Sequence, residues 1–376
     1  MSYNSNKIIK KIFLLSTSLI ILSCVAPATQ GFSMSDQEVK REQNIQKELA
    51  ILQSRKYQKR IDTVALPILR ENKDLCGSKI TYYLGFSFET LLGKSNDWKE
   101  AYILSLNLNL NNYKVVNVIE GSSAYKAGIL QGDILVSIND VKVGTTEKEI
   151  KSFRKRLENI EYKLDNAKIV IRRDGLTKNI RYSPERICDY NSTYDSSDYL
   201  NAYADGENIV ISKGMMRFVE DDTELALIIA HELAHNAMGH IQAKQTNAVP
   251  GLMIDLLGAY VGVDTRGTYA NLTSQMFSKE FETEADYVGI YYLYRANYEI
   301  DNVAYFWRRM SAENAGSIAK NRNSTHPSSP ERFIQIEKTV EEIYGKEKNG
   351  EPIKPNVLIP NVRKNNSNWK KRNNWD

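Results

Sequence analysis

The pattern His231-Glu232-x-x-His235 offers the clearest chemistry in this sequence. Two histidines four residues apart lie on the same face of a helix, so both imidazoles can reach one metal ion. Glu232 lies about 100° further round the helix than His231, near such a metal but poorly placed to be a ligand, which leaves it free to act as a base. The pattern therefore predicts a hydrolytic metal site. The alternative is a structural helix with two surface histidines.

The surroundings of this pattern favour the metal site. Residues 223–244 form an apolar stretch that is expected to be a single buried helix, with acceptors for its first N–H groups just before it. The chain has four histidines, and three of them fall in this stretch. Unliganded polar groups would be costly on such a helix. The third of these histidines, His240, lies on another face and is expected to be structural.

A third metal ligand is expected from a later helical pattern. Glu282 and Asp286 are four residues apart and share a face. Glu282 is the expected ligand, and Asp286 is expected to accept a hydrogen bond from a ligating imidazole. Glu284 is the rival ligand. His326, in a later loop, is either inert or able to bind a transition-state oxyanion or the metal itself.

Length and composition limit the class of protein. The chain has 376 residues, of which 42% are hydrophobic and 26% charged, so it is globular with room for about two domains. Its net charge is +4, and the positive charge is dispersed except at the C-terminal end. This distribution argues against a nucleic-acid partner.

The N-terminal residues predict export. A lysine-rich start, an apolar run over 12–22 and small residues after it are typical of a secretory signal, and the run is too short to span a bilayer permanently. Residues 1–24 are interpreted as a lipoprotein signal peptide because Leu22-Ser23-Cys24 resembles a lipobox, with lipidation at Cys24. Ala26-Pro27-Ala28 is the competing site for ordinary signal peptidase. A periplasmic protein that contacts the membrane only through a lipid anchor is therefore expected.

The remaining cysteines support the same compartment. If Cys24 is removed or lipidated, Cys76 and Cys188 are the only two left, and an exported protein meets an oxidising environment. They are predicted to form a disulfide. Two buried thiols are the alternative.

Two stretches precede the metal helix. Residues 35–75 predict an N-terminal helical segment, with 62–75 entering the catalytic domain as a strand or short helix. Residues 79–184 have short alternating strands and glycine turns, and 115–140 strongly resemble a PDZ domain, with that family's strand, Gly-Ser-x-Ala helix and Gly-Asp hairpin in order.

The PDZ resemblance implies a peptide site. Leu84, Gly85 and Phe86 would form the loop that holds a peptide's C-terminal carboxylate, and 147–157 would wall the groove. Residues 91–110 are longer than in a minimal PDZ domain, so the groove can be remodelled or covered. A rigid spacer or regulatory wall is the alternative role of this domain.

The chemical residues together resemble a known family. His231-Glu232-x-x-His235, Glu282-x-Glu284-Ala285-Asp286 and Thr325-His326-Pro327 with Arg332 are similar, in this order, to the gluzincin-type zinc metallopeptidases that include the CAAX prenyl endopeptidases and bacterial periplasmic quality-control peptidases. The resemblance implies one Zn²⁺ bound by His231, His235 and Glu282, with Glu232 as the base. It also implies that His326 approaches the metal, in a catalytic or an inhibitory role.

The same resemblance implies how substrate binds. Before the metal helix, Asp205-Gly206 predicts the turn of a hairpin whose second strand is 208–212. By similarity, the first strand pairs with an extended polypeptide substrate; its residues are Asn201, Ala202, Tyr203 and Ala204.

The expected fold class is α+β. It consists of a mainly helical zincin-type metallopeptidase domain with a small edge-strand sheet over 190–345, an inserted PDZ-like domain over 79–184, and a flexible basic tail over 346–376. The expected function is a zinc-dependent endopeptidase of the bacterial cell envelope that cleaves unfolded or misassembled proteins. One alternative is a non-catalytic PDZ scaffold or chaperone with a structural zinc site. The other is metal-dependent hydrolysis of a non-peptide ester or amide.

Overall fold

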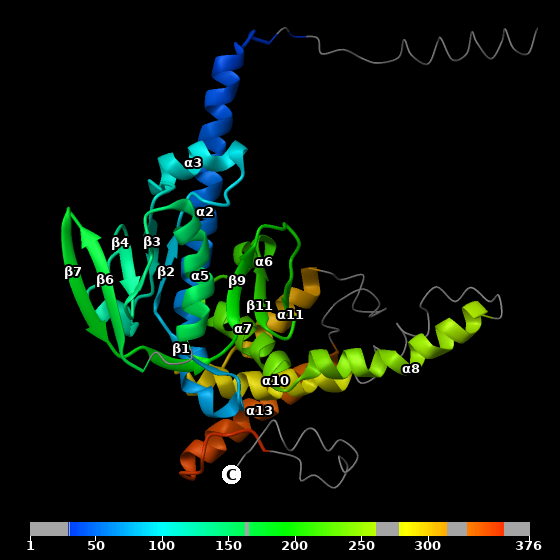
Figure 1. Ribbon diagram of the computed structural model, residues 1–376. Helices are drawn as coiled ribbons and strands as arrows, with labels where there is room; N and C mark the ends of the chain where they lie inside the picture. Colours follow the sequence, from blue (N-terminus) through cyan, green and yellow to red (C-terminus); the bar gives the residue numbers. More distant parts are fainter. Residues whose placement is uncertain (1–28, 30, 162–164, 261–277, 314–328, 357–376) are drawn as a thin grey trace, which may run out of the picture. The chain divides into compact units, whose positions relative to one another are not determined.

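The computed structural model describes residues 29, 31–161, 165–260, 278–313 and 329–356 (Figure 1). The chain divides into two compact units, residues 1–46 and 47–376. The first unit holds the start of helix α2 (Asp36–Glu71). A capping box begins this helix: the Ser35 N–H donates to Glu38 Oε2 at 2.7 Å, and the Glu38 N–H donates back to Ser35 Oγ at 3.3 Å.

Helix α2 continues without a break to Glu71, so the expectation of a separate strand or short helix over 62–75 is wrong up to that point. A short 3₁₀ helix, η1 (Lys73–Leu75), follows. The second half of α2 buries one helical face, made by Ile61, Val64, Ala65, Leu66, Ile68 and Leu69. These residues belong to the same hydrophobic core as the helices that carry the candidate site.

A six-stranded sheet forms the PDZ domain. Its strands are β2 (Phe86–Glu89), β3 (Tyr113–Val118), β4 (Ile134–Ile138), β6 (Ala167–Arg173) and β7 (Leu176–Tyr182) in this spatial order, and β5 (Val141–Lys142) pairs with β4. All these pairings are antiparallel. Helices α4 (Ser123–Lys126) and α5 (Glu147–Glu161) complete the domain. The β6–β7 hairpin turns at Asp174 and Gly175, whose φ angles of 51° and 78° are those of the turns that favour Asp-Gly.

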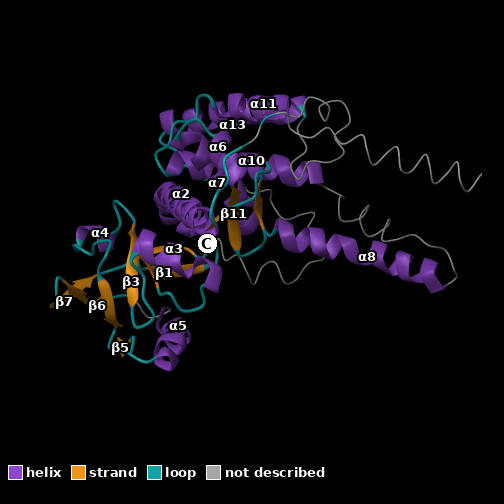
Figure 2. Ribbon diagram, turned by 90° about the horizontal axis from the view of Figure 1, so that it is seen from above, coloured by secondary structure: helices purple, strands orange, loops and turns teal. Residues whose placement is uncertain are grey.

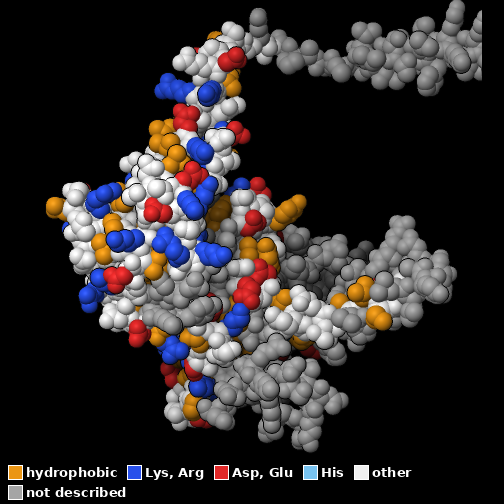
Figure 3. Space-filling view, in the orientation of Figure 1, with side chains coloured by type: hydrophobic (Ala, Val, Ile, Leu, Met, Phe, Trp, Pro, Cys, Tyr) orange, Lys and Arg blue, Asp and Glu red, His pale blue; other side chains and the backbone are white. Residues whose placement is uncertain are grey.

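The long segment over 91–110 contains helix α3 (Asn96–Leu106). Leu91 and Leu108, on either side of this helix, pack with Val116 of β3 in a small hydrophobic cluster of their own. On the face shown in Figure 3, both Lys or Arg and Asp or Glu side chains are exposed.

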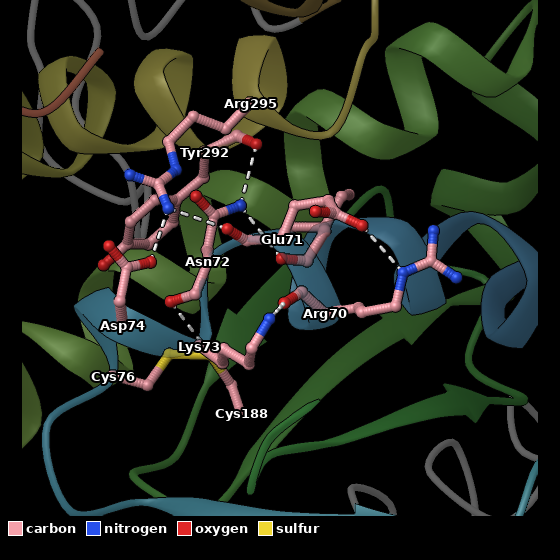
Figure 4. Close-up of a disulfide and its surroundings, with 10 residues drawn as sticks. Arg70, Glu71, Asn72, Lys73, Asp74, Cys76, Cys188, Tyr292 and Arg295 are labelled. Carbon is pink, nitrogen blue, oxygen red and sulfur yellow. Dashed lines mark hydrogen bonds and ion pairs between the residues drawn. A yellow bond between two sulfur atoms is a disulfide. The ribbon is translucent and has the colours of Figure 1, made fainter. Parts of the chain in front are cut away.

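The PDZ domain is inserted through a two-stranded neck. Strand β1 (Ile80–Tyr83) pairs antiparallel with β8 (Glu185–Cys188), and a disulfide joins Cys76 to Cys188 with a Cα–Cα distance of 5.7 Å (Figure 4). Close to the bridge, the side chain of Asn72 donates to the carbonyl oxygens of Ile68 and Tyr292, both at 2.9 Å. These bonds tie the end of α2 to a later helix, which carries Tyr292.

The domain that carries the predicted site combines a small sheet with helices. Strand β11 (Asn208–Ser212) lies between β10 (Ala202–Ala204), its antiparallel partner, and β9 (Asn191–Asp195), its parallel partner. The helices are α6 (Lys213–Phe218), α7 (Asp222–Ala237), α8 (His240–Tyr260), α10 (Ser278–Arg295), α11 (Val303–Glu313) and α13 (Pro330–Lys348). Both β10 and β11 contact α7, and β11 and α7 can be followed in Figures 1 and 2. Among the described residues, no helix has the length and apolar character needed to cross a membrane.

Two predicted boundaries differ from the structure. The expected single helix over 223–244 is two helices, because α7 ends at Ala237 and α8 begins at His240. Gly239 turns the chain between them with a φ of 72°, which favours glycine. The predicted start of the tail at residue 346 is also too early, because α13 continues to Lys348 and the N–H of Asn356 donates to Tyr287 Oη at 2.9 Å. The rest of that tail, 357–376, lies outside the described residues.

Candidate active site

Helices α7 and α10 carry the candidate site and pack very closely. Asp221 caps α7, since its Oδ1 accepts the N–H of Glu224 at 2.9 Å. A Cβ added at Gly289 of α10 would lie 3.1 Å from both Cα and N of His231, so any other residue would require the helices to separate by a few tenths of an ångström. Glycine at this position therefore brings the backbone of α10 next to the first histidine of the pattern.

The three predicted metal ligands come together between these helices. The ligand atoms of His231, His235 and Glu282 all lie within 4.8 Å of one another. The two Nε2 atoms are 3.1 Å apart, and the Glu282 carboxylate oxygens lie 3.5 Å from His231 Nε2 and 3.3 Å from His235 Nε2. All three side chains are buried, with 0–2% of their surface exposed. Two imidazole nitrogens and a carboxylate oxygen make a donor set that fits a divalent metal ion.

Asp286 and Arg332 fix the orientation of His231. The Nδ1 of His231 is 3.0 Å from Asp286 Oδ1, and Arg332 donates from Nε and Nη2 to the two oxygens of Asp286 at 2.7 and 2.8 Å. The hydrogen bond to Asp286 places the imidazole proton on Nδ1 and turns Nε2 toward the ligand cluster. The structure thus gives Asp286 the place that the helical spacing predicts.

The charges around His231 favour a proton when no metal competes. Burial lowers the pKa of His231, but its hydrogen bonds to Asp286 and Glu282 raise that pKa overall to about 9. Burial raises the pKa of Asp286, yet the Arg332 guanidinium and His231 hold it below its ordinary value. A metal ion has to displace a proton from this cluster, so metal binding and proton release are coupled.

Arg332 and Trp307 pack against the predicted ligands. Arg332 Nη1 lies 3.4 Å from Glu282 Oε2, and the guanidinium lies 5.4 Å from the centre of the Trp307 ring. The Trp307 ring centre is also 4.9 Å from that of His231. The sequence indicates Arg332 only as part of a motif, and nothing in the sequence around α11 singles out Trp307.

Glu232 belongs to the same buried cluster. Its side chain lies on α7 beside His231 and is 2% exposed. Burial lowers the pKa of Arg332, whereas the charges of Asp286, Glu282 and Glu232 raise it above its ordinary value. The Arg332 guanidinium therefore lies in the field of three carboxylates, and the predicted base is one of them.

His240 and Glu284 lie against the second histidine. Nδ1 of His240 is 2.9 Å from Nδ1 of His235, and Nε2 of His240 is 3.1 Å from Glu284 Oε2. Glu284, the rival third ligand, thus contacts His240, and Glu282 takes the place among the three ligand atoms. The structural role expected for His240 assumes a single continuous helix, which would place this residue on another face; α7 instead ends at Ala237, before His240.

Asn236 attaches the predicted edge strand and its hairpin to α7. The hairpin forms as expected, with Asn201 just before β10, and Tyr203 in this end strand is 42% exposed. The Gly206 N–H donates to Asn236 Oδ1 at 2.8 Å, and Asn236 Nδ2 donates to the Asn208 carbonyl at 3.0 Å. Asn236, which follows His235 directly, was not found by sequence reasoning because asparagine in a helix gives no pattern of its own.

The predicted PDZ carboxylate loop precedes β2, the end strand of its sheet. Gly85 has a φ of 75°, and a Cβ there would lie 2.7 Å from Ser122 Oγ. The carbonyl of Gly85 accepts from the Ile119 N–H at 2.9 Å, and Tyr182 Oη donates to the Leu84 carbonyl at 2.7 Å. Peptide binding at this loop stays a prediction. Cys24 and His326 lie outside the described residues, so the predictions made for them also stand as predictions.

A PDZ domain and a helical domain with a buried His-His-Glu group define a metallopeptidase-like architecture. Comparisons with known proteins agree. Residues 176–340 match the model of peptidase family M48, and residues 114–153 match that of the PDZ domain.

Curated relatives point to the same class. The mitochondrial metalloendopeptidase OMA1 of Schizosaccharomyces pombe is 29% identical over 143 residues, which cover 36% of this chain and 42% of that protein. The beta-barrel assembly-enhancing protease is 25% identical over 131 residues in Yersinia pestis (31% of this chain, 27% of that one) and 28% identical over 119 residues in Escherichia coli K12 (28% and 24%). The chain thus spans less than half of these relatives.

A crystal structure of the HtrA3 PDZ domain bound to a phage-derived ligand is similar to part of this chain. The match covers 29% of this chain and 88% of the HtrA3 chain, at 16% sequence identity and a TM-score of 0.21. The family matches and the named relatives together support a metalloprotease related to the M48 peptidases. A relation to the CAAX prenyl endopeptidases stays a prediction.

Proposed function

We propose that this protein is a zinc-dependent endopeptidase of the bacterial cell envelope that cleaves unfolded or misassembled proteins. The observation that carries the proposal is the buried group of His231, His235 and Glu282, whose ligand atoms lie within 4.8 Å of one another, with Glu232 next to the first histidine on α7. Two nitrogens and one oxygen are the donors of a known class of catalytic zinc site, which keeps its fourth position open.

The proposed chemistry divides between the ion and the side chains. A zinc ion held by His231, His235 and Glu282 would supply Lewis acidity to the scissile carbonyl and to a water, whose pKa such sites lower to about 7. Glu232 accepts the proton of the attacking water and delivers it to the leaving amine. Asp286 keeps the proton of His231 on Nδ1, and Arg332 balances the negative charge of Asp286.

Strand β10 is the proposed binding surface for substrate. It lies at the end of its sheet and contacts α7, and an extended polypeptide would add to it as a further strand. Strand addition reads the backbone more than the side chains. Unfolded chains expose extended backbone, whereas folded proteins have already paired most of it, so this mode of binding favours unfolded polypeptides of many sequences.

The location and the remaining roles rest on sequence and relatives. The signal-like residues 1–24 with Cys24, and the resemblance to a bacterial protease named for β-barrel assembly, support a periplasmic, lipid-anchored enzyme. The PDZ loop at Gly85 is proposed to bind peptide C-termini. His326 is proposed to act at the metal: higher casein cleavage by His326→Ala would indicate an inhibitory role, and loss of cleavage a catalytic one.

The first test is cleavage of unfolded casein by the purified chain without residues 1–24. Cleavage should stop when a chelator removes the metal and return when one equivalent of zinc is added. Glu282→Ala should lose both zinc and cleavage, whereas Glu284→Ala should keep a measurable fraction of each. Cleavage that persists in the metal-free protein, or zinc content that depends on Glu284 but not on Glu282, would contradict the proposal.

A further inference from the structure

The second histidine of the site is supported by a chain of polar groups that ends at a carboxylate. His235 directs Nε2 toward Glu282 at 3.3 Å and Nδ1 toward His240 Nδ1 at 2.9 Å. The other nitrogen of His240, Nε2, lies 3.1 Å from Glu284 Oε2. Both imidazoles are buried, whereas 31% of the Glu284 side chain is exposed.

Proton counting assigns a direction to each of these hydrogen bonds. When Nε2 of His235 is a metal ligand, it carries no proton, so the proton of the neutral imidazole is on Nδ1. Nδ1 of His235 then donates to Nδ1 of His240, which must accept. The proton of His240 is consequently on Nε2, where it donates to Glu284. Each ring nitrogen of His235 and His240 thus has one defined role as donor, acceptor or metal ligand.

We propose that His240 and Glu284 form a positioning pair that holds His235 in the tautomer and ring orientation needed to bind the metal. This inference rests on the metal site of the proposed function. It gives His235 the kind of support that Asp286 and Arg332 give to His231, by way of a second imidazole in place of a direct carboxylate.

The local structure holds this pair in place. Gly239, with its φ of 72°, ends the turn after α7 and brings His240 to the start of α8 beside His235. The Phe281 ring stacks on the His240 ring, with centres 4.7 Å apart and planes inclined by 21°. On α10, Phe281 and Glu284 are three residues apart and both contact His240, while Glu282 and Asp286, four residues apart, contact the ligand histidines. One helix therefore supplies a ligand and the support for both ligand histidines.

The inference is tested by zinc affinity, measured by competition with a chromophoric chelator. His240→Leu keeps much of the side-chain volume but removes the acceptor, and it should weaken zinc binding roughly 10- to 100-fold. His240→Asn places an amide oxygen near the position of Nδ1 and should keep the affinity within roughly threefold of the parent, because that oxygen can accept from His235. Glu280→Gln, an exposed change in the first turn of α10, is the matched control and should have no effect.

A second pair of variants, at Glu284, tests the same inference without changing His240, in case substitutions of His240 impair folding. Glu284→Ala should weaken zinc binding several-fold, and Glu284→Gln should restore most of the loss, because the amide oxygen still accepts from His240. Circular dichroism of the zinc-free proteins shows whether each variant is folded. Folded His240→Leu and Glu284→Ala variants that bind zinc within twofold of the parent would overturn the positioning role. If the parent itself binds no zinc, the proposed function fails, and the two failures are thereby distinguished.

Discussion

Alanine at Gly289 should destabilise the protein, although alanine is the better helix former. In an open helical position, glycine to alanine gains about 1 kcal/mol. At Gly289, the new Cβ would lie 3.1 Å from Cα and N of His231 and 3.3 Å from the carbonyl carbon of Ala230. These atoms are helix backbone and cannot rotate away, so α10 must move back by a few tenths of an ångström. Overpacking of this kind costs about 1–3 kcal/mol, which leaves a net loss of about 1 kcal/mol.

The matched control for this prediction is Gly345→Ala in α13. A Cβ at Gly345 would have no atom within 4 Å, so the same substitution should raise the free energy of unfolding by about 1 kcal/mol. Urea unfolding of the zinc-free proteins measures both changes. Gly289→Ala should also weaken zinc binding, because the shift of α10 moves Glu282 away from the two histidines. If Gly289→Ala stabilises the protein as much as Gly345→Ala does, the inference that α10 lies too close to α7 at Gly289 to accept a Cβ is wrong.

Three further predictions concern other parts of the chain. Replacing Cys76 and Cys188 by alanine removes a bridge between residues 112 apart and should lower the free energy of unfolding by roughly 2–5 kcal/mol; an unchanged urea midpoint would contradict this. Burial raises the pKa of Asp62 from 3.8 to about 6, so the folded state holds this proton more tightly than the unfolded state. The free energy of unfolding, taken relative to Asp62→Asn, should therefore rise by roughly 2.5 kcal/mol as the pH falls from 8 to 4, and a flat difference would refute the assignment. Asn236→Ala releases the β10–β11 hairpin from α7 and should raise KM for casein roughly tenfold with kcat within about threefold, whereas equal KM values would show that the hairpin does not bind substrate.

Local spacing is sufficient to predict the core of the site. Residues four apart on a helix share a face whatever surrounds them, so His231 pairs with His235, and Glu282 with Asp286, on the sequence alone. The choice of Glu282 over Glu284 depends on which face of α10 packs on α7. Gly289 lies close to His231 on this face, and no single-residue pattern reveals that contact.

The roles that sequence reasoning missed depend on tertiary contacts. His240 is beside His235 because the chain turns at Gly239, and treating 223–244 as one helix placed it elsewhere. Asn236 and Trp307 act through segments distant in the sequence, which only folding brings together. Helix α2 was divided at residue 62 because its exposed and buried halves differ in composition, although the helical period continues through both.

The central claim is that Glu232 acts as the base of a zinc peptidase, and one comparison tests it most directly. Parent protein and Glu232→Gln are each loaded with one equivalent of zinc, the zinc content of each is measured, and both are incubated with unfolded casein. If Glu232 is the base, the two proteins should contain equal amounts of zinc and only the parent should cleave casein. Cleavage by zinc-loaded Glu232→Gln at the parent's rate would contradict it.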